Sequence, residues 1–161
     1  MKVKLRGGVP VRLEQIEAIE AELGVVLPSS FRAFVAQHDG ARPENNEVVV
    51  GALGFCVQGF IPLIQMQEVM RRIGDLPSGF IPVAQDDCGN MVILSLSDGG
   101  VRFWDHEDPS EVSIVWNSFA EFLDAITPRD ATSVTLEPGQ VQRVWIDPEF
   151  LRRVKGESGS A

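Results

Sequence analysis

Side chains able to act as nucleophiles or metal ligands gather near the middle of the chain, in the segment Asp86–Asn90. Cys88 could act as a nucleophile if His38 or His106 served as its base. No motif of a cysteine-dependent enzyme surrounds Cys88, and a thiol without a nearby base or helix terminus stays protonated at neutral pH. We therefore predict that the protein is not an enzyme and has no catalytic residues.

The same segment could bind a metal ion through Asp86, Asp87 and Cys88. Adjacent carboxylates point in different directions, however, and the spaced acidic residues of a calcium loop do not follow. The two histidines and two cysteines of the chain also lack the spacing of a zinc motif. The alternative is a tight turn, in which Gly89 takes a positive φ and Asn90 bonds locally. We predict the turn, with no metal and no cofactor.

Acidic side chains recur at the turns and strand ends of this region. Five of them are candidate partner contacts: Asp86, Asp87, Asp105, Glu107 and Asp108. If the strands form a meander, these carboxylates lie along one sheet edge, where they would attract a basic protein in a salt-dependent way. The alternative is that turns favour Asp for its local backbone geometry, so that the charges are merely solvated.

The tryptophans divide into two groups. Trp104 and Trp116 fall on adjacent predicted strands, and we expect them to pack in the core. Trp145 lies near Arg143 and Ile146 in a later segment. It is a candidate anchor for a partner or a dimer, or alternatively it covers an apolar face of the body.

The charge of the chain is uneven. Its 161 residues are 44% hydrophobic, which suits one domain with a packed core, and carry a net charge of −9. Residues 1–12 sum to +4 and residues 143–161 to +1, so residues 13–142 carry −14. An acidic body argues against binding to duplex nucleic acid or to an anionic membrane surface.

Two cysteines are too few for a disulfide scaffold, and the sequence holds neither an apolar run long enough to span a bilayer nor the apolar core of a signal peptide. These features favour a reducing compartment, and we expect the protein in the cytoplasm.

Four helices and a series of strands must position these side chains. Apolar spacing predicts helices over residues 12–23, after Leu27-Pro28 as far as Gly40, over 65–73 and from Ser118 to Pro128. Strands are predicted over Phe80–Gln85, Met91–Leu96, Val101–Asp105 and Val112–Trp116. Short polar turns join these strands, so we expect antiparallel pairing and an α+β fold.

The chain changes character after Pro128. Thr132–Leu136 and Val141–Ile146 flank a Pro-Gly turn and predict a hairpin, and a short helix is predicted over Glu149–Val154. We therefore divide the chain into a domain over 1–128, an extension over 129–155 that packs on the domain or on a partner, and a flexible tail over 156–161.

Four segments, taken in order, resemble the SUKH superfamily, whose members carry an SMI1/KNR4-like domain. They are Leu23–Phe31 with His38–Gly40, Phe80–Asn90, Val101–Glu107, and Ser118–Leu123. The resemblance covers about residues 12–127 and omits the extension. Residues 41–60 show no pattern of the family.

The resemblance implies an α+β domain whose mainly antiparallel sheet is flanked by helices. Many bacterial members resemble immunity proteins, which bind and inhibit polymorphic or contact-dependent toxins, often nucleases. Eukaryotic relatives are regulatory scaffolds. The resemblance thus implies a cognate toxin domain as the partner, with a non-toxin scaffold or ligand-binding module as the alternative. It carries over no catalytic residue and does not indicate an oligomeric state.

Overall fold

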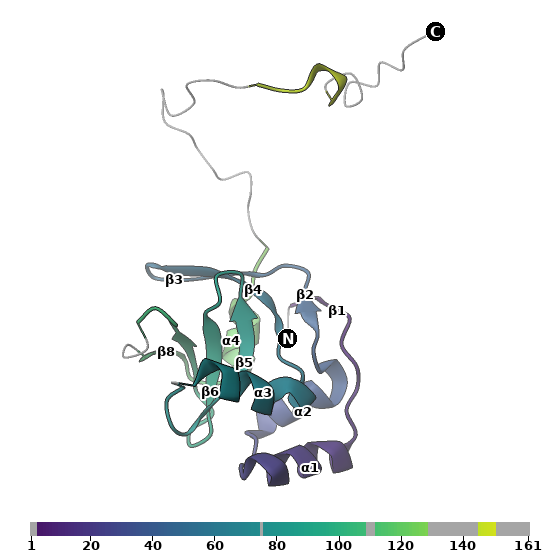
Figure 1. The fold of residues 1–161 in the computed structure, drawn as a ribbon, viewed down its shortest axis with the longest axis vertical. Helices are drawn as coiled ribbons and strands as arrows, with labels where there is room; N and C mark the ends of the chain where they lie inside the picture. The colour runs from purple at the N-terminus through teal and green to yellow at the C-terminus, as the bar shows by residue number, and fades with distance from the viewer. Residues whose placement is uncertain (1–2, 75, 109–111, 129–144, 151–161) are drawn as a thin grey trace. The chain divides into compact units, whose positions relative to one another are not determined.

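A six-stranded antiparallel sheet forms the centre of the fold (Figure 1). The computed structural model describes residues 3–74, 76–108, 112–128 and 145–150. The chain divides into one compact unit over Met1–Arg129 and a second over Asp130–Ala161. Every element labelled in Figure 1 belongs to the first unit.

The sheet is a meander, because each strand pairs antiparallel with the next strand along the chain. Its strands are β3 (Glu47–Val50), β4 (Leu53–Phe60), β5 (Phe80–Asp86), β6 (Met91–Ser95), β7 (Val101–Trp104) and β8 (Val112–Trp116). Two short strands, β1 (Leu5–Arg6) and β2 (Arg42–Pro43), pair separately. The four predicted strands and their antiparallel pairing are confirmed as β5–β8, and so is the α+β class.

The hairpin of β3 and β4 lies in the stretch for which the sequence analysis predicted no element. Its turn is Gly51-Ala52, and Gly51 has a φ of +59°. A side chain is strained in this region of backbone conformation, and a two-residue hairpin favours it. Only Val48 of β3 is buried, while Val49 and Val50 are exposed. This strand therefore lacks a clear alternation of apolar and polar residues.

Four helices accompany the sheet. They are α1 (Leu13–Leu23), α2 (Ser29–His38), α3 (Leu63–Ile73) and α4 (Phe119–Ala125). All four agree with the predicted helical segments to within two or three residues at each end. In the described part of the chain, no helix is long and apolar enough to span a bilayer.

Local signals explain where these helices begin and end. Gly24 ends α1 in the left-handed conformation, with a φ of +66°. At α4, the Ser118 hydroxyl accepts a hydrogen bond from the Glu121 backbone N–H at 3.2 Å. The Glu121 carboxylate accepts from the Asn117 N–H at 3.0 Å instead of from the N–H of Ser118. The pair Ser118 and Glu121 has the spacing of a capping box, but only half of it forms, because its reciprocal bond is displaced by one residue to Asn117.

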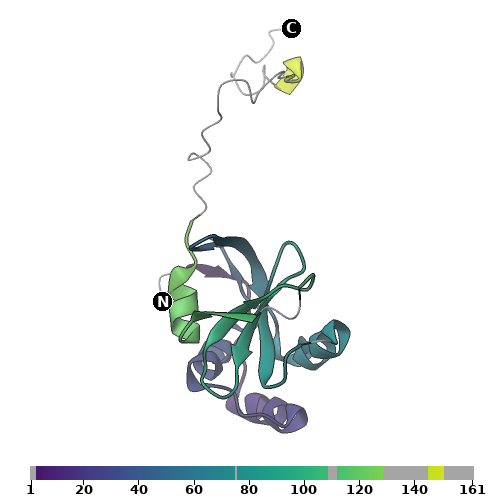
Figure 2. The same ribbon diagram turned by 90° about the vertical axis from the view of Figure 1, so that its left-hand side faces the viewer.

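The two faces of the sheet are covered by different helices, with α3 on one side and α4 on the other (Figure 2). Strand β6 divides its side chains between them. Val92 and Leu94 join the larger core with the phenylalanines of α2 and α4. Met91 and Ile93 join a smaller cluster with Val69 of α3. Both faces of β6 are thus buried, which explains why this strand is apolar from Met91 to Leu94.

Asp39 fixes the start of α3, the helix that will form one wall of the site. Its carboxylate is 7% exposed and accepts a hydrogen bond from the Leu63 N–H at 2.9 Å. Burial raises the pKa of Asp39, and the bond from Leu63 opposes that rise. An acidic side chain at a helix N-terminus also complements the helix dipole.

Most of the predicted hairpin over residues 132–146 lies outside the described residues, as do residues 151–154 of the predicted short helix. Residues 148–150 are helical, and the Asp147 carboxylate accepts a hydrogen bond from the Glu149 N–H at 2.7 Å. Asp147 thus caps the start of this helical turn.

Candidate protein-binding surface

The turn from β5 to β6 is organised by Asp86. This residue is 4% exposed, and its carboxylate accepts hydrogen bonds from the Cys88 N–H at 2.9 Å, the Asn90 N–H at 2.7 Å and the Asn90 side-chain amide at 2.9 Å. Gly89 has a φ of +96°. The predicted tight turn is therefore confirmed. Asp86 stabilises this turn through its hydrogen bonds and exposes almost no surface to a partner.

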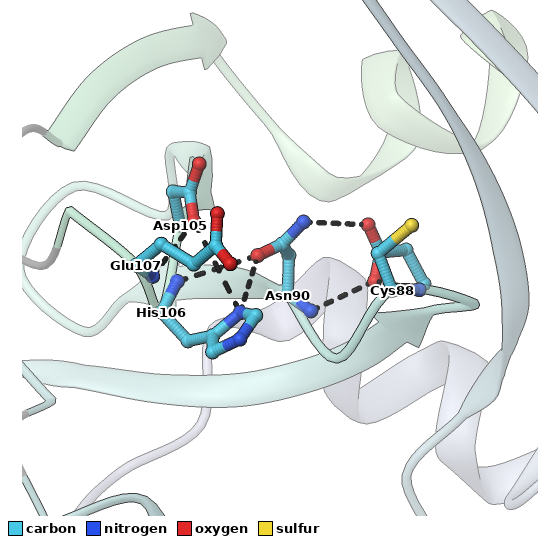
Figure 3. Close-up of polar contacts among 6 residues, drawn as sticks. Cys88, Asn90, Asp105, His106 and Glu107 are labelled. Carbon is cyan, nitrogen blue, oxygen red and sulfur yellow. Dashed lines mark hydrogen bonds and ion pairs between the residues drawn. The ribbon is translucent and has the colours of Figure 1, made fainter.

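A second turn follows β7 and is joined to the first by Asn90. The side-chain nitrogen of Asn90 donates to Asp86, so the side-chain oxygen of Asn90 faces His106. This oxygen lies 2.8 Å from Nδ1 of His106 and 3.3 Å from its backbone nitrogen. This arrangement places the proton of a neutral imidazole on Nδ1. Figure 3 shows Asn90 between His106 and Cys88. The Asp105 carboxylate lies 4.0 Å from Nδ1, whereas the Asn90 oxygen is at hydrogen-bond distance, so Asn90 is the hydrogen-bond partner of the ring.

Four carboxylates remain at the surface of these two turns, and we call them the acidic edge: Asp87, Asp105, Glu107 and Asp108. Asp105 is half-buried and accepts a hydrogen bond from the Glu107 N–H at 2.8 Å, while the other three are exposed. The pairing of Met91 with Trp104 brings the two turns to the same end of the sheet. The structure therefore leaves four of the five predicted acidic contacts at the surface and buries the fifth, Asp86.

Cys88 is exposed, but its surroundings do not favour a thiolate. The negative charges of Asp86 and Asp87 raise the pKa of the Cys88 thiol above its ordinary value. A catalytic cysteine needs the opposite shift. Cys88, Asp86 and Asp87 each place one donor atom within 4.8 Å of the others. The hydrogen bonds that Asp86 accepts in the turn account for this proximity.

The two tryptophans of the sheet lie in the core, as the sequence predicts. Trp104 and Trp116 are 3% and 5% exposed, so both belong to the core. Trp145 belongs to the second unit and is 74% exposed. Its role as a partner anchor stays a prediction.

The other candidate base, His38, lies on α2. It is half-buried, with its ring centroid 5.6 Å from that of Phe34.

A hollow of about 580 Å³ adjoins the acidic edge. It is lined by Asp87 and His106 together with Trp104 and Met91 on the sheet and Ile73 on α3. Sequence reasoning did not identify three further residues that line it, Gln58, Arg72 and Gln85. The predicted helix over 65–73 included Arg72, but the strand that carries Gln58 was not predicted. The sequence therefore offered no reason to place Gln58 next to Arg72 and Gln85. The hollow and the acidic edge are neighbours, with Asp87 common to both.

We predict that Asp86→Ala lowers the free energy of unfolding by about 2–3 kcal/mol, because three donors in a part-buried turn lose their acceptor. Urea denaturation measures this change. The matched variant Asp87→Ala removes an exposed carboxylate and should change stability by less than about 0.5 kcal/mol. Equal losses in the two variants would contradict the structural role of Asp86.

Comparison with known proteins identifies a family and a relative that the sequence matches. A model of the SMI1 / KNR4 family (SUKH-1) matches residues 10–125. The chain is also similar to the SPbeta prophage-derived uncharacterized protein YokK of Bacillus subtilis (strain 168). The two are 23% identical over 137 residues, a match that covers 68% of this chain and 71% of that protein.

Proposed function

Since the chain belongs to the SMI1 / KNR4 family (SUKH-1), we propose that it is an immunity protein that binds and neutralises a bacterial toxin domain. Members of this family are often immunity proteins and are generally not catalytic. The proposed partner is a basic protein, with a nuclease domain as the most fitting class. The proposed compartment is the cytoplasm, where such a toxin would act.

The acidic edge is the observation that supports this proposal. A nuclease active site must attract phosphates, so its cleft carries cationic side chains. Asp87, Asp105, Glu107 and Asp108 offer such a cleft four carboxylates on two turns that Asn90 holds together. Turns held in this way lose little conformational freedom on binding, which favours affinity. In this mechanism the protein covers the cleft and blocks its substrate, and no cofactor takes part.

The extension over residues 129–155 has a proposed role in the same complex. Trp145 is 74% exposed, and large exposed aromatic side chains frequently anchor protein interfaces. We place it against the toxin domain or against the body of its own chain. Trp145→Ala would weaken binding to the toxin in the first arrangement and lower the stability of the protein alone in the second.

The test uses the C-terminal domain of a toxin encoded beside this gene. Co-expression with the protein should restore growth of cells that produce the toxin domain, and the purified pair should form a complex of equal stoichiometry by calorimetry. Failure to bind at low ionic strength, where electrostatic attraction is strongest, would overturn the proposal.

A further inference from the structure

A second hollow, of about 510 Å³, lies between α3 and the strands β2, β4 and β5. Its polar lining includes Arg42, Gln58, Gln65, Arg72 and Gln85. We call it the arginine hollow. It shares Gln58, Arg72 and Gln85 with the hollow beside the acidic edge, so the two adjoin. Its volume is within the range of sites that bind small molecules.

Two cations from distant parts of the sequence line this hollow. Arg42 comes from β2 and Arg72 from α3, and both side chains are exposed. Within the described part of the chain, neither guanidinium has a carboxylate at ion-pair distance, although Glu68 also lines the hollow. The lining thus carries two positive charges and one negative charge, whereas residues 13–142 carry −14. Its charge is opposite in sign to that of the acidic body.

The amides add hydrogen-bond donors. The Gln85 side-chain nitrogen donates to the Gln58 side-chain oxygen at 2.6 Å. This bond fixes the orientation of both amides and leaves the nitrogen of Gln58 as a further donor at the hollow. Together with the two guanidinium groups, this nitrogen matches the lone pairs of an oxyanion.

Two glycines keep the walls of the hollow close together. A Cβ atom at Gly59 would lie 3.3 Å from Cγ of Arg42, so the absence of a side chain there lets Arg42 pack along β4. Gly40 has a φ of +68°, and a Cβ atom at this position would lie 3.0 Å from Cγ of Pro62. The missing side chain at Gly59 thus leaves room for the stem of Arg42 beside β4.

We propose that the arginine hollow binds a small ligand that carries a phosphate or carboxylate group, held between Arg42 and Arg72. Planar guanidinium groups bind both kinds of oxyanion through paired hydrogen bonds. This site is separate from the acidic edge, and it stands whether or not the partner of that edge is a toxin.

The experiment titrates pyrophosphate and citrate, in separate arms, into the full-length protein at low ionic strength. Side-chain amide signals in ¹H–¹⁵N spectra report on Gln58, Gln65 and Gln85. We expect saturable shifts of these signals, and a roughly tenfold loss of affinity in Arg42→Gln and in Arg72→Gln. The matched control is Arg71→Gln, which removes the same charge from the same helix at a residue outside the hollow. Its affinity should equal that of the parent protein.

Each outcome decides the proposal. Tighter binding of pyrophosphate assigns a phosphate ligand, and tighter binding of citrate assigns a carboxylate ligand. The absence of saturable shifts with both probes overturns the site. An equal loss of affinity in Arg71→Gln also overturns it, because binding would then depend on overall charge. The backbone signals of each variant show whether it remains folded.

Discussion

Replacing Asp87, Glu107 and Asp108 together by lysine is expected to slow association with the basic toxin domain by about tenfold to a hundredfold at low salt. The three side chains are exposed at the surface of the two joined turns. Their carboxylates would attract the cationic cleft before contact, so reversing their charge acts mainly on the association rate. Stopped-flow mixing at several salt concentrations measures the effect.

The salt series separates attraction from contact. Screening shortens the range of electrostatic forces to about 10 Å at 0.1 M salt, so the difference between variant and parent should shrink as salt increases. The matched control reverses three exposed acids elsewhere, Glu14 and Glu22 on α1 and Glu44 after β2. It makes the same change in net charge. If the control slows association equally, the net charge of the protein is responsible and the acidic edge is not the binding surface.

Asp86 is left out of this variant for a structural reason. The sequence places two aspartates side by side, and nothing in their type distinguishes their roles. The structure separates them, because Asp86 is buried and accepts three hydrogen bonds whereas Asp87 is exposed. A change at Asp86 would disturb the turn and reduce binding indirectly.

The β5–β8 meander was predictable because its signals are local. Each strand is short and mainly apolar, and turn residues such as Gly89 and Gly99, both at positive φ, separate the strands. The β3–β4 hairpin was not predictable in this way. Its turn is Gly51-Ala52, and two of the three consecutive valines of β3 are exposed, so neither turn type nor alternation marks it. The arginine hollow depends on this hairpin, because Gln58 and Gly59 lie on β4.

The two hollows suggest different uses of one surface. Arg72 and the Gln58–Gln85 pair belong to both, so a ligand in the arginine hollow would lie next to a partner docked on the acidic edge. Arg72 could then contact either one. Arg42→Gln therefore separates the two sites best, because Arg42 lines only the arginine hollow, whereas Arg72→Gln removes a charge from both hollows.

Phe119→Ala is expected to cause the largest loss of stability, about 3–5 kcal/mol in the free energy of unfolding. Phe119 is fully buried at the first position of α4. Its ring centroid lies 5.0 Å from that of Phe31 and 5.1 Å from that of Phe34, both on α2, and 6.1 Å from that of Phe60 on β4. Truncation would leave a cavity where two helices meet the sheet.

Urea denaturation of three variants separates this cause from a general effect of substitution. Phe119→Leu fills most of the cavity and should cost only about 1–2 kcal/mol. Ile64→Ala truncates a side chain that is 79% exposed on α3 and should change stability by less than about 0.5 kcal/mol. A domain of this kind has about 5–15 kcal/mol of stability in total, so Phe119→Ala removes a large share of it. If Phe119→Ala and Ile64→Ala were equally stable, Phe119 would not be the centre of the core.

The acidic edge lies outside this aromatic cluster, so the folded fraction of Phe119→Ala should still bind the toxin domain with the affinity of the parent protein.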